Sequence, residues 1–411
     1  MKFLRSLYHY LLARLGGIIY KHPSRDIFVI GVTGTKGKST VIELINVILE
    51  RAGKKTALLS SVRQKIDNIS NLNMTGMSMP GRFFIQRFLN SAVSRGCEYA
   101  IIEVTSQGVL QHRHRFIDFG AAVITNLEPE HIEAHGSFDS YRANKIKFFN
   151  DAAIYSEGKN KLFFINSDMK DIRYFTDAVR SNGKIIFYNK KDVTELKIKT
   201  KLIGEFNLEN ISVAIAFARS QNIDWETIKN AIESFDGVPG RLEFIQRVPF
   251  SVVIDYAHTP DSLEKVYRTL YKEMKLSNKI SNVKNGKLIC VLGAAGGGRD
   301  AWKRPVMGKL AADYCNNIFL TNEDPFNENP ENIVNEIEAG IPLELKKRVR
   351  KILDRREAIR AAIKIAKNKD AVIITGKGCE PYIRIAGGKN IPWNEKEAVL
   401  KILNEERIEV K

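Results

Sequence analysis

The sequence predicts an α/β protein with two domains, each built on a largely parallel sheet, behind a short helical N-terminal segment. Three observations support this fold class. Short apolar runs recur along the 411 residues and alternate with stretches of helical length and periodicity. Polar, often glycine-containing loops follow most of these runs, as in open sheets whose parallel strands end at a common edge. The turn-rich segment FDGVPGR, at 235–241, divides the series in two.

The composition is that of a globular protein, with 44% apolar and 27% charged side chains. The net charge of +17 fits attraction of polyanionic small molecules such as nucleotides, or simply a solvated basic surface. No zinc-finger spacing or RNP motif accompanies it, so no nucleic-acid partner is expected. Cys97, Cys290, Cys315 and Cys379 form no CxxC pair, which favours buried thiols in a reducing cytoplasm.

Residues 1–26 are basic and apolar, a composition that also occurs in signal peptides and membrane anchors. Arg5 and Arg14 interrupt the apolar run and no small-residue cleavage site follows, so a signal peptide is not expected. The run is too short and too charged for a membrane-spanning helix. We expect an amphipathic helix packed on the body of a cytoplasmic monomer, with weak attachment to the inner membrane face as the alternative.

The first domain, residues 27–237, is expected to contain a mainly parallel sheet. Its first strand, 27–32, is a continuous apolar run, which is typical of a parallel strand buried on both faces. A helix follows and is expected to end at Gly53. Further strands are predicted at 55–61, 99–106, 121–127, 161–168 and 184–189.

The second domain, residues 238–411, repeats the alternation. Strands are predicted at 251–257, 287–295, 317–323 and 370–378, and segments such as 260–274 are helical in pattern. This order is typical of a Rossmann-like α/β domain. In both domains ligands are expected at the carboxyl ends of the strands.

The segment GVTGTKGKST follows the first strand and leads into the first helix, which is the context of a phosphate-binding loop. Gly34 and Gly37 would let backbone amides approach a triphosphate. Lys38 would reach the terminal phosphates, and Ser39 would ligate Mg²⁺. The first domain is therefore predicted to be of the P-loop ATPase type, with ATP and Mg²⁺ as cofactors.

Acidic and histidine side chains follow two further strands. Glu103 ends one strand, where its carboxylate can ligate a cation. His131 and His135 stand at helical spacing beside Glu130 and Glu133, but the HExxH pattern and a third protein ligand are lacking, which disfavours zinc. An oxygen-rich Mg²⁺ site with one histidine fits better beside a nucleotide.

Nine segments carry a family resemblance. They occur in the order GVTGTKGKST, EVTSQGVLQHR, TNLEPEHIEAHGSFDSYRANK, GEFNLEN, GVPGRLE, DYAHTPDSLE, GAAGGGRDAWKRPVMG, TNEDP and GKGCE. The chain resembles the Mur ligase family from about Phe28 to Tyr382, and within it the MurE branch, which adds the third amino acid to the muramoyl dipeptide in peptidoglycan biosynthesis. The family's loop is G-T-x-G-K-[ST], which residues 34–39 satisfy although Val32 breaks the Walker A pattern.

The resemblance implies roles for residues of the first domain. Catalysis would fall to Lys38, Glu103, His131 and Lys145, the last of which is carbamylated in most of the family. The Mg²⁺ ligands would be Ser39, Glu103, His131 and carbamylated Lys145. ATP would be bound by Gly34, Thr35, Lys36, Gly37, Lys38, Ser39, Thr40, Asn207 and Asn210. The acidic peptide substrate would be held by Thr105, Ser106 and Arg113.

The resemblance also implies roles for the second domain. Arg241, Asp255, Tyr256 and His258 match residues that close onto ATP. Substrate contacts would come from Glu323, Asp324, Gly376 and Glu380.

The implied reaction is ATP-dependent formation of an amide bond between a cell-wall precursor peptide and an amino acid. A substrate carboxylate attacks the γ-phosphate, which gives an acyl phosphate and ADP, and an amine then displaces phosphate from the acyl carbon. Lys38 and Mg²⁺ would neutralise the transferring phosphoryl group. Domain closure would protect the acyl phosphate from water.

Two departures from the family bear on the substrate. Only 26 residues precede the ATP-binding strand, so the family's UDP-binding domain is expected to be missing or replaced by the N-terminal helix. Diaminopimelate-adding members carry D-N-P-R, whereas Phe326 occupies the arginine position here, which disfavours diaminopimelate. Glu323 and Asp324 suit a cationic end, as in lysine or ornithine. Cys379 stands where histidine is usual.

Other functions were compared with this one. A folylpolyglutamate-synthase-like ligase also lacks the UDP-binding domain, but the segments EVTSQGVLQHR and DYAHTP favour the MurE branch. A non-catalytic nucleotide-binding scaffold is a further alternative. Such a scaffold need not retain Lys38, Glu103, His131 and Lys145, so their presence favours an active ligase.

Overall fold

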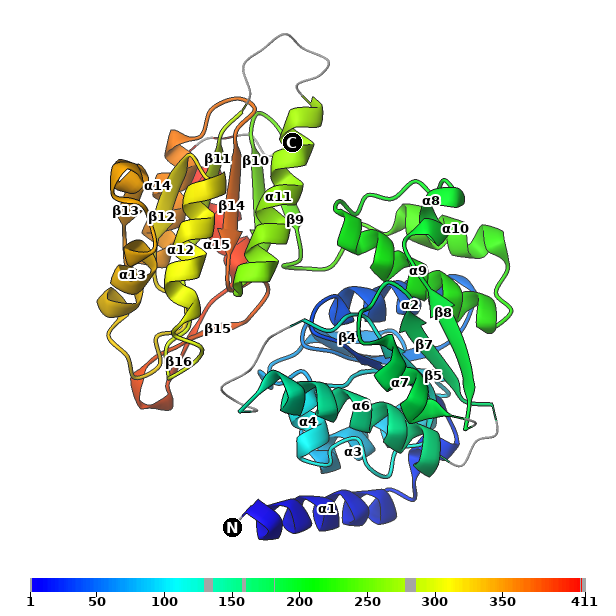
Figure 1. Ribbon diagram of the computed structural model, residues 1–411. Coiled ribbons are helices and arrows are strands. Elements are labelled where there is room, and N and C mark those ends of the chain that lie inside the picture. The colour runs from blue at the N-terminus through cyan, green and yellow to red at the C-terminus, as the bar shows by residue number, and fades with distance from the viewer. Residues whose placement is uncertain are drawn as a thin grey trace. The chain divides into compact units, whose positions relative to one another are not determined.

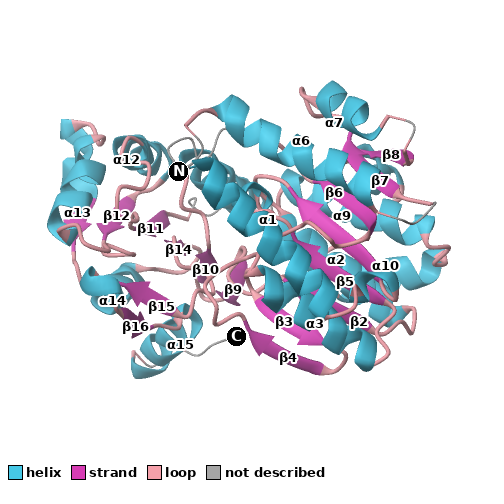
Figure 2. Cartoon of the chain, turned by 90° about the horizontal axis from the view of Figure 1, so that it is seen from below, coloured by secondary structure: helices cyan, strands magenta, loops and turns pink. Residues whose placement is uncertain are grey.

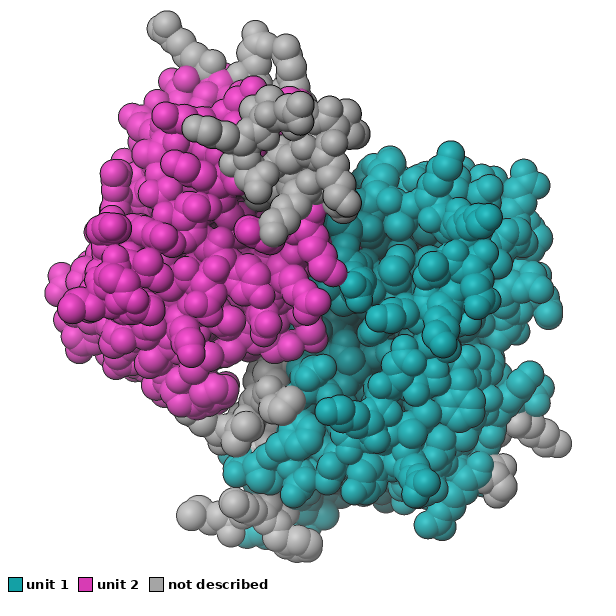
Figure 3. All heavy atoms as spheres, turned by 45° about the horizontal axis from the view of Figure 1, so that its top comes forward, with its two compact units in different colours: residues 1–236 teal, residues 237–411 magenta. Residues whose placement is uncertain are grey.

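The computed structural model describes residues 2–128, 136–156, 160–180, 182–277, 286–406 and 408. The chain forms two compact units, Met1–Asp236 and Gly237–Lys411 (Figures 1 and 3). The boundary expected from the sequence stood between residues 237 and 238. The N-terminal helix belongs to unit 1.

Unit 1 is built on one eight-stranded sheet in the order β4-β3-β2-β5-β1-β6-β7-β8. Its strands are β1 (Phe28–Thr33), β2 (Thr56–Leu59), β3 (Arg63–Ile66), β4 (Ile69–Leu72), β5 (Tyr99–Glu103), β6 (Phe119–Ile124), β7 (Leu162–Asn166) and β8 (Lys184–Tyr188). Its helices are α1 (Lys2–Ile19), η1 (Pro23–Arg25), α2 (Lys38–Arg51), α3 (Arg82–Ser94), α4 (Ser106–Leu110), α6 (Phe138–Tyr155), α7 (Ile172–Val179), α8 (Lys191–Glu195), α9 (Glu205–Ser220) and α10 (Trp225–Ser234).

The six predicted strands of this sheet are present and pair in parallel, with β1 between β5 and β6. Val29, Ile30 and Val32 of β1 are fully buried because helices cover both faces of the sheet (Figure 2). One core joins the sheet to α3, α6 and α7, and a second joins it to α2, α9 and α10. The strand that carries the candidate phosphate loop is therefore buried on both faces.

The hairpin β3–β4 extends one edge of this sheet in an antiparallel sense and was not predicted. Its strands, RQKI and ISNL, contain no apolar run, and all four side chains of β4 are exposed. Antiparallel edge strands with a solvated face lack the continuous apolar signal of buried parallel strands. The hairpin nevertheless positions Ser60 and Ser61, which lie between β2 and β3.

Unit 2 is built on a six-stranded sheet in the order β13-β12-β11-β14-β10-β9, in which only β9 is antiparallel. Its strands are β9 (Glu243–Gln246), β10 (Ser251–Asp255), β11 (Leu288–Leu292), β12 (Asn317–Leu320), β13 (Val349–Lys351) and β14 (Ala371–Thr375), and β15 (Tyr382–Arg384) pairs separately with β16 (Asn390–Pro392). The helices are α11 (Pro260–Ser277), α12 (Lys303–Tyr314), α13 (Pro330–Ala339), η2 (Leu343–Arg348), α14 (Arg355–Ile365), η3 (Ala386–Gly388) and α15 (Glu395–Glu405).

A buried ion pair supports the strand ends of unit 2. Arg355 of α14 pairs with Glu395 of α15, and both side chains are almost fully buried. The same guanidinium donates to the carbonyl oxygens of Asn322, at 3.2 Å, and Thr375, at 2.7 Å. Asn322 follows β12 and Thr375 is the last residue of β14, so one arginine fixes the places where both loops with the candidate substrate residues begin.

Helices α12 and α13 pack closely at Gly308. A Cβ at Gly308 of α12 would lie 1.9 Å from the carbonyl oxygen of Ile337 in α13. We predict that Gly308→Ala lowers the free energy of unfolding by about 1–3 kcal/mol through overpacking, although alanine is the better helix former. Gly16→Ala is the control, because its Cβ would meet nothing closer than 3.6 Å. Urea unfolding measures both, and a Gly308→Ala variant as stable as wild type would contradict the prediction.

Candidate functional site

The candidate phosphate loop connects β1 to α2 and is held by the residues that follow β6. The Thr35 amide donates to the Asn126 carbonyl at 3.0 Å, and the Lys36 amide donates to Asn126 Oδ1 at 2.9 Å. Thr125 Oγ1 and Asn126 Nδ2 donate to the Lys36 carbonyl at 2.6 and 3.1 Å. The loop is therefore fixed by backbone and side-chain bonds to its neighbouring strand end.

Two glycines make this geometry possible. Gly34 has φ +143°, and a Cβ there would lie 1.8 Å from Thr125 Oγ1. Gly37 has φ +81°, and a Cβ there would lie 2.3 Å from Asn210 Oδ1. Asn210, which the sequence assigned to ATP, thus lies against the loop, and its Nδ2 donates to Asn207 Oδ1 at 3.0 Å.

Lys38 and Lys145 converge on one backbone oxygen. Lys38 Nζ donates to the Gly34 carbonyl at 3.0 Å, and Lys145 Nζ donates to the same oxygen at 2.8 Å. Lys145 lies on α6, 111 residues from Gly34 in sequence, and is only 1% exposed. Its ammonium stacks on the Tyr141 ring at 4.7 Å, and Tyr141 contacts Thr35 Oγ1 at 3.1 Å. The fold therefore brings together two lysines that the sequence linked only through the family resemblance.

A chain of oxygen atoms runs beside these lysines. Ser39 Oγ lies 3.0 Å from Ser61 Oγ, and the Ser61 amide donates to Glu103 Oε2 at 2.8 Å. Glu103 Oε1 is 4.0 Å from Lys38 Nζ. Ser61 was not predicted from the sequence, because a serine that follows a short strand has no distinguishing pattern.

The amino end of α2 adds positive electrostatic potential beside the phosphate loop. Gly37 is its N-cap, no acidic residue occupies its first turn, and Ser39 and Thr40 are nearly buried there. The backbone amides and the helix dipole attract anions to such an end. Backbone, dipole and two lysines together form a site suited to a polyphosphate.

The candidate peptide-binding residues follow β5. Thr105 caps α4, its Oγ1 accepting from the Gly108 amide at 3.0 Å, and Ser106 is buried in the first turn. Arg113 donates to the Met79 carbonyl and, at 2.7 Å, to Gln111 Oε1. The Arg113 Nε is buried and has no hydrogen-bond partner within the described parts of the chain. His131 lies outside the described residues.

Unit 2 gathers its candidate ATP residues on the segment before β9 and at the carboxyl end of β10. Asp255 accepts from the amides of Leu242 and Ala257, both at 2.7 Å. The Arg241 guanidinium stacks on the Tyr256 ring at 4.2 Å, and the His258 ring lies 4.7 Å from the same ring. Burial raises the pKa of Tyr256 well above its ordinary value.

A buried charge cluster occupies the candidate amino-acid site. Lys377, fully buried, lies 2.8 Å from Asp324 Oδ1 and 2.6 Å from Glu380 Oε2. Arg384 donates to Asp324 from its amide and its guanidinium, each at 2.9 Å. Asp324 is thus neutralised within the chain. Lys377 and Arg384 were not assigned from the sequence, although Lys377 lies within the quoted GKGCE segment.

Glu323 and Phe326 differ from their neighbours in this cluster. Burial raises the pKa of Glu323 to about 7, despite the nearby Lys377 and Arg355 charges, and its Oε2 has no hydrogen-bond partner in the described structure. A Cβ at Gly376 would lie 2.4 Å from that oxygen. Phe326 has φ +53° and stacks under the Arg299 guanidinium at 4.6 Å.

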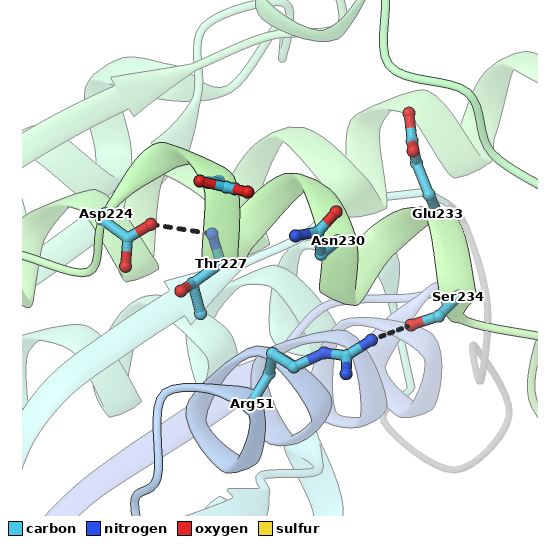
Figure 4. Close-up of a pocket in the computed structure, with 7 residues that line it drawn as sticks. Arg51, Asp224, Thr227, Asn230, Glu233 and Ser234 are labelled. Atoms are coloured by element: carbon cyan, nitrogen blue, oxygen red, sulfur yellow. Dashed lines mark hydrogen bonds between the residues drawn. The ribbon is translucent and has the colours of Figure 1, made fainter.

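Other parts of the described structure contain no comparable cluster of candidate functional residues. No group of three or more His, Cys, Asp or Glu side chains comes together there to hold a metal. A depression of about 610 Å³ is lined by Arg51, at the carboxyl end of α2, and by α10 residues such as Glu233 and Ser234 (Figure 4). It lies roughly 20 Å from the phosphate loop by the length of α2. Within the described helices, none has the length and apolarity required to cross a membrane.

Comparisons with known proteins identify the family of the chain. The family model "Mur ligase middle domain" matches residues 32–218, and "Mur ligase, glutamate ligase domain" matches residues 240–378. The UDP-N-acetylmuramoyl-L-alanyl-D-glutamate–2,6-diaminopimelate ligase of Syntrophomonas wolfei is 37% identical, over 95% of this chain and 81% of its own length. The UDP-N-acetylmuramyl-tripeptide synthetase of Roseiflexus is 32% identical, over 96% of this chain and 82% of its own.

Solved structures match as well. A 2,6-diaminopimelate ligase structure aligns with a TM-score of 0.60 at 28% identity, over 93% of this chain and 79% of that one. A folylpolyglutamate synthase of Mycobacterium tuberculosis, complexed with ADP and AMPPCP, aligns with a TM-score of 0.68 at 16% identity, over 90% of this chain and 92% of that one. The second match shows a shared fold alone.

The raised pKa of Glu323 makes the free energy of unfolding depend on pH. Its folded pKa, about 7, exceeds the ordinary 4.5, so its contribution to stability is fully present below about pH 4.5 and is lost as the pH rises through 7. We predict that Glu323→Gln stabilises the protein at pH 8 by on the order of 3 kcal/mol and has much less effect near pH 4.5. Urea unfolding at both pH values measures this, with the exposed Glu344→Gln as control. An equal effect at both pH values would show that folding does not raise the pKa of Glu323.

Proposed function

The chain belongs to the Mur ligase family and is an ATP-dependent ligase that forms amide bonds, and on this premise we propose that it adds an amino acid to the peptide of a muramoyl cell-wall precursor. The observation that carries the proposal is the convergence of Lys38 and Lys145 on the Gly34 carbonyl, beside Glu103 and Ser39. We further propose that it works as a monomer in the cytoplasm.

The phosphate loop supplies the first half of the reaction. A precursor carboxylate attacks the γ-phosphorus of ATP, the bond to the β,γ-bridging oxygen breaks, and ADP leaves. Lys38 and the α2 amides stabilise the negative charge on the transferring group from fixed positions, so little reorganisation is needed. In the second half the amino acid's amine attacks the acyl carbon, loses a proton, and phosphate leaves as the amide forms.

The residues present fit a Mg²⁺ ion. Ser39 and Glu103 offer a hydroxyl and a carboxylate joined through Ser61, which suits an ion that keeps several water or phosphate ligands. Mg²⁺ supplies charge neutralisation at the phosphates when bound. His131 and a carbamylated Lys145 are the further ligands we propose. A carbamate retains one N–H at Lys145 Nζ, which is enough to keep the bond to the Gly34 carbonyl.

The identity of the added amino acid rests on the loop after β12. Relatives at 32–37% identity carry names that specify 2,6-diaminopimelate. Phe326 lacks the guanidinium that would bind a distal carboxylate, whereas buried Glu323 lacks a partner for one oxygen among the described residues. An ammonium group would supply that partner and favour the ionised carboxylate. We therefore propose that lysine or ornithine is added in preference to diaminopimelate.

Carbamylation of Lys145 is directly measurable. Protein equilibrated with ¹³C-bicarbonate is expected to show a carbamate carbon signal that Lys145→Ala abolishes. Turnover of that variant should fall by about 10²–10³-fold, the usual cost of losing one preorganised charged contact. Lys147→Ala is the matched control, because Lys147 lies on the same helix and contacts Asp151 instead. A fully active protein without a carbamate signal would contradict the assignment.

The ligase activity is tested by phosphate release from ATP with UDP-muramoyl dipeptide and a panel of lysine, ornithine and diaminopimelate. Release should require acceptor and amino acid jointly, favour lysine or ornithine, and fall about 10²–10³-fold in Lys38→Ala. Phe326→Arg should improve diaminopimelate use by about tenfold or more, through a bidentate carboxylate contact, and Phe326→Leu should not.

Other outcomes of this assay would overturn parts of the proposal. No stimulation by any pair would refute the muramoyl substrate, and stimulation by folate with glutamate would favour the folylpolyglutamate synthase function. Hydrolysis unaffected by Lys38→Ala would remove the phosphate-loop assignment.

A further inference from the structure

Helix α1 presents an apolar surface to solvent. Its described side chains that are exposed fall largely on one stripe and include Leu4 (68% exposed), Leu11 (51%) and Ile18 (55%). The full stripe is Leu4, Leu7, Tyr8, Leu11, Leu15, Ile18 and Ile19. At 3.6 residues per turn these positions span about 120° of the helix surface. A surface helix normally turns such a stripe toward the core, so the orientation of α1 requires a reason.

The opposite side of α1 packs on the rest of unit 1, where the helix contacts α3 (Figure 1). Ala13 is 1% exposed, and Gly16 and Gly17 are buried. A Cβ at Gly17 would lie 3.3 Å from Phe116 Cβ, so the helix approaches the body through residues without side chains. The Tyr10 ring packs on that of Phe116, with centroids 5.3 Å apart.

Polar contacts strengthen this orientation at both ends of the helix. Ser6 Oγ lies 2.9 Å from His112 Nε2. Beyond the carboxyl end, Ser24 Oγ accepts from the Asp118 amide at 2.9 Å, and Arg25 pairs with Asp118 at 3.5 Å. The small and polar residues thus face the protein, and the long aliphatic residues face outward.

Positive charge borders the apolar stripe. Arg5 and Arg14 are exposed and stand on either edge of the stripe by helical geometry. No acidic residue occurs among residues 1–25. Arg82 and Arg113 of the adjoining segments lie close enough to His9 that, after burial, their charges are among the causes that lower its pKa. The surface is therefore apolar along its centre and cationic at its margins.

This combination matches an anionic lipid surface. Interfacial helices bury an apolar stripe at the boundary of headgroups and acyl chains and hold basic residues beside the phosphates. A second copy of the chain would bring arginines against arginines, with no acid on the helix to compensate. We propose that α1 docks unit 1 on a membrane rich in anionic lipid, inserting its apolar stripe and placing Arg5 and Arg14 at the headgroups.

Vesicle flotation of the full chain tests this inference, using phosphatidylcholine vesicles with and without phosphatidylglycerol. Wild type should float with the anionic vesicles and much less with the neutral ones. Leu11→Glu/Leu15→Glu should weaken partitioning on the order of a hundredfold, because two leucine side chains no longer leave water. Arg5→Gln/Arg14→Gln should weaken binding to anionic vesicles about tenfold. The control is Leu343→Glu, a leucine that is 80% exposed in unit 2 and should have no effect.

Three results would overturn the inference, and none of them bears on the ligase activity. The first is wild type absent from both floated fractions. The second is a leucine variant that binds as wild type does while both melt at the same temperature. Sedimentation equilibrium gives the third, namely a wild-type dimer that Leu11→Glu/Leu15→Glu dissociates, which would assign the stripe to a second copy. Unchanged melting of the variants with loss of flotation supports the lipid surface.

Discussion

The candidate site depends on the carbonyl oxygen of Gly34, which accepts hydrogen bonds from two lysines at 2.8 and 3.0 Å. Burying a cation costs free energy unless polar groups replace its water. One shared acceptor holds Lys38 and Lys145 side by side at the amino end of α2, where the helix dipole is also positive. A polyphosphate neutralises the Lys38 ammonium and the helix dipole, and so the loop is organised for it before it binds. Only glycine permits this, because Thr125 occupies the space of a Cβ at residue 34.

Unit 2 also buries a lysine ammonium, and there carboxylates stabilise it. Lys377 is fully buried between Asp324 and Glu380, and Arg384 completes the neutralisation of Asp324. Removing one partner of a buried pair costs far more than the pair contributes, so these charges hold the loops after β12 and β14 together. The Phe326 amide donates to the Arg384 carbonyl at 3.1 Å, but its ring stacks with Arg299 and stands outside the ion pairs. Its side chain can therefore change the amino acid selected while the loops keep their arrangement.

The sequence predicted the fold well wherever strands are buried on both faces. Every predicted strand is present, because continuous apolar runs between polar loops have few other interpretations. The hairpin β3–β4 was missed because solvated edge strands lack that signal, and with it the role of Ser61 was missed. The residues of the phosphate loop follow from local order, but the approach of Lys145 across 111 positions does not. Only the family resemblance indicated it, since a lysine in a helix has no sequence signal for burial.

In helix α1 the spacing of apolar residues does not determine which way the apolar stripe faces. Its spacing of apolar residues defines a stripe, and the usual interpretation turns such a stripe inward. The direction is decided by the opposite face, where Gly16 and Gly17 allow a backbone approach that leucines would prevent. The family model of the first domain begins at residue 32, after this helix. Glycines opposite an apolar stripe therefore indicate that the stripe faces outward, and the absence of acids beside it indicates what kind of surface it meets.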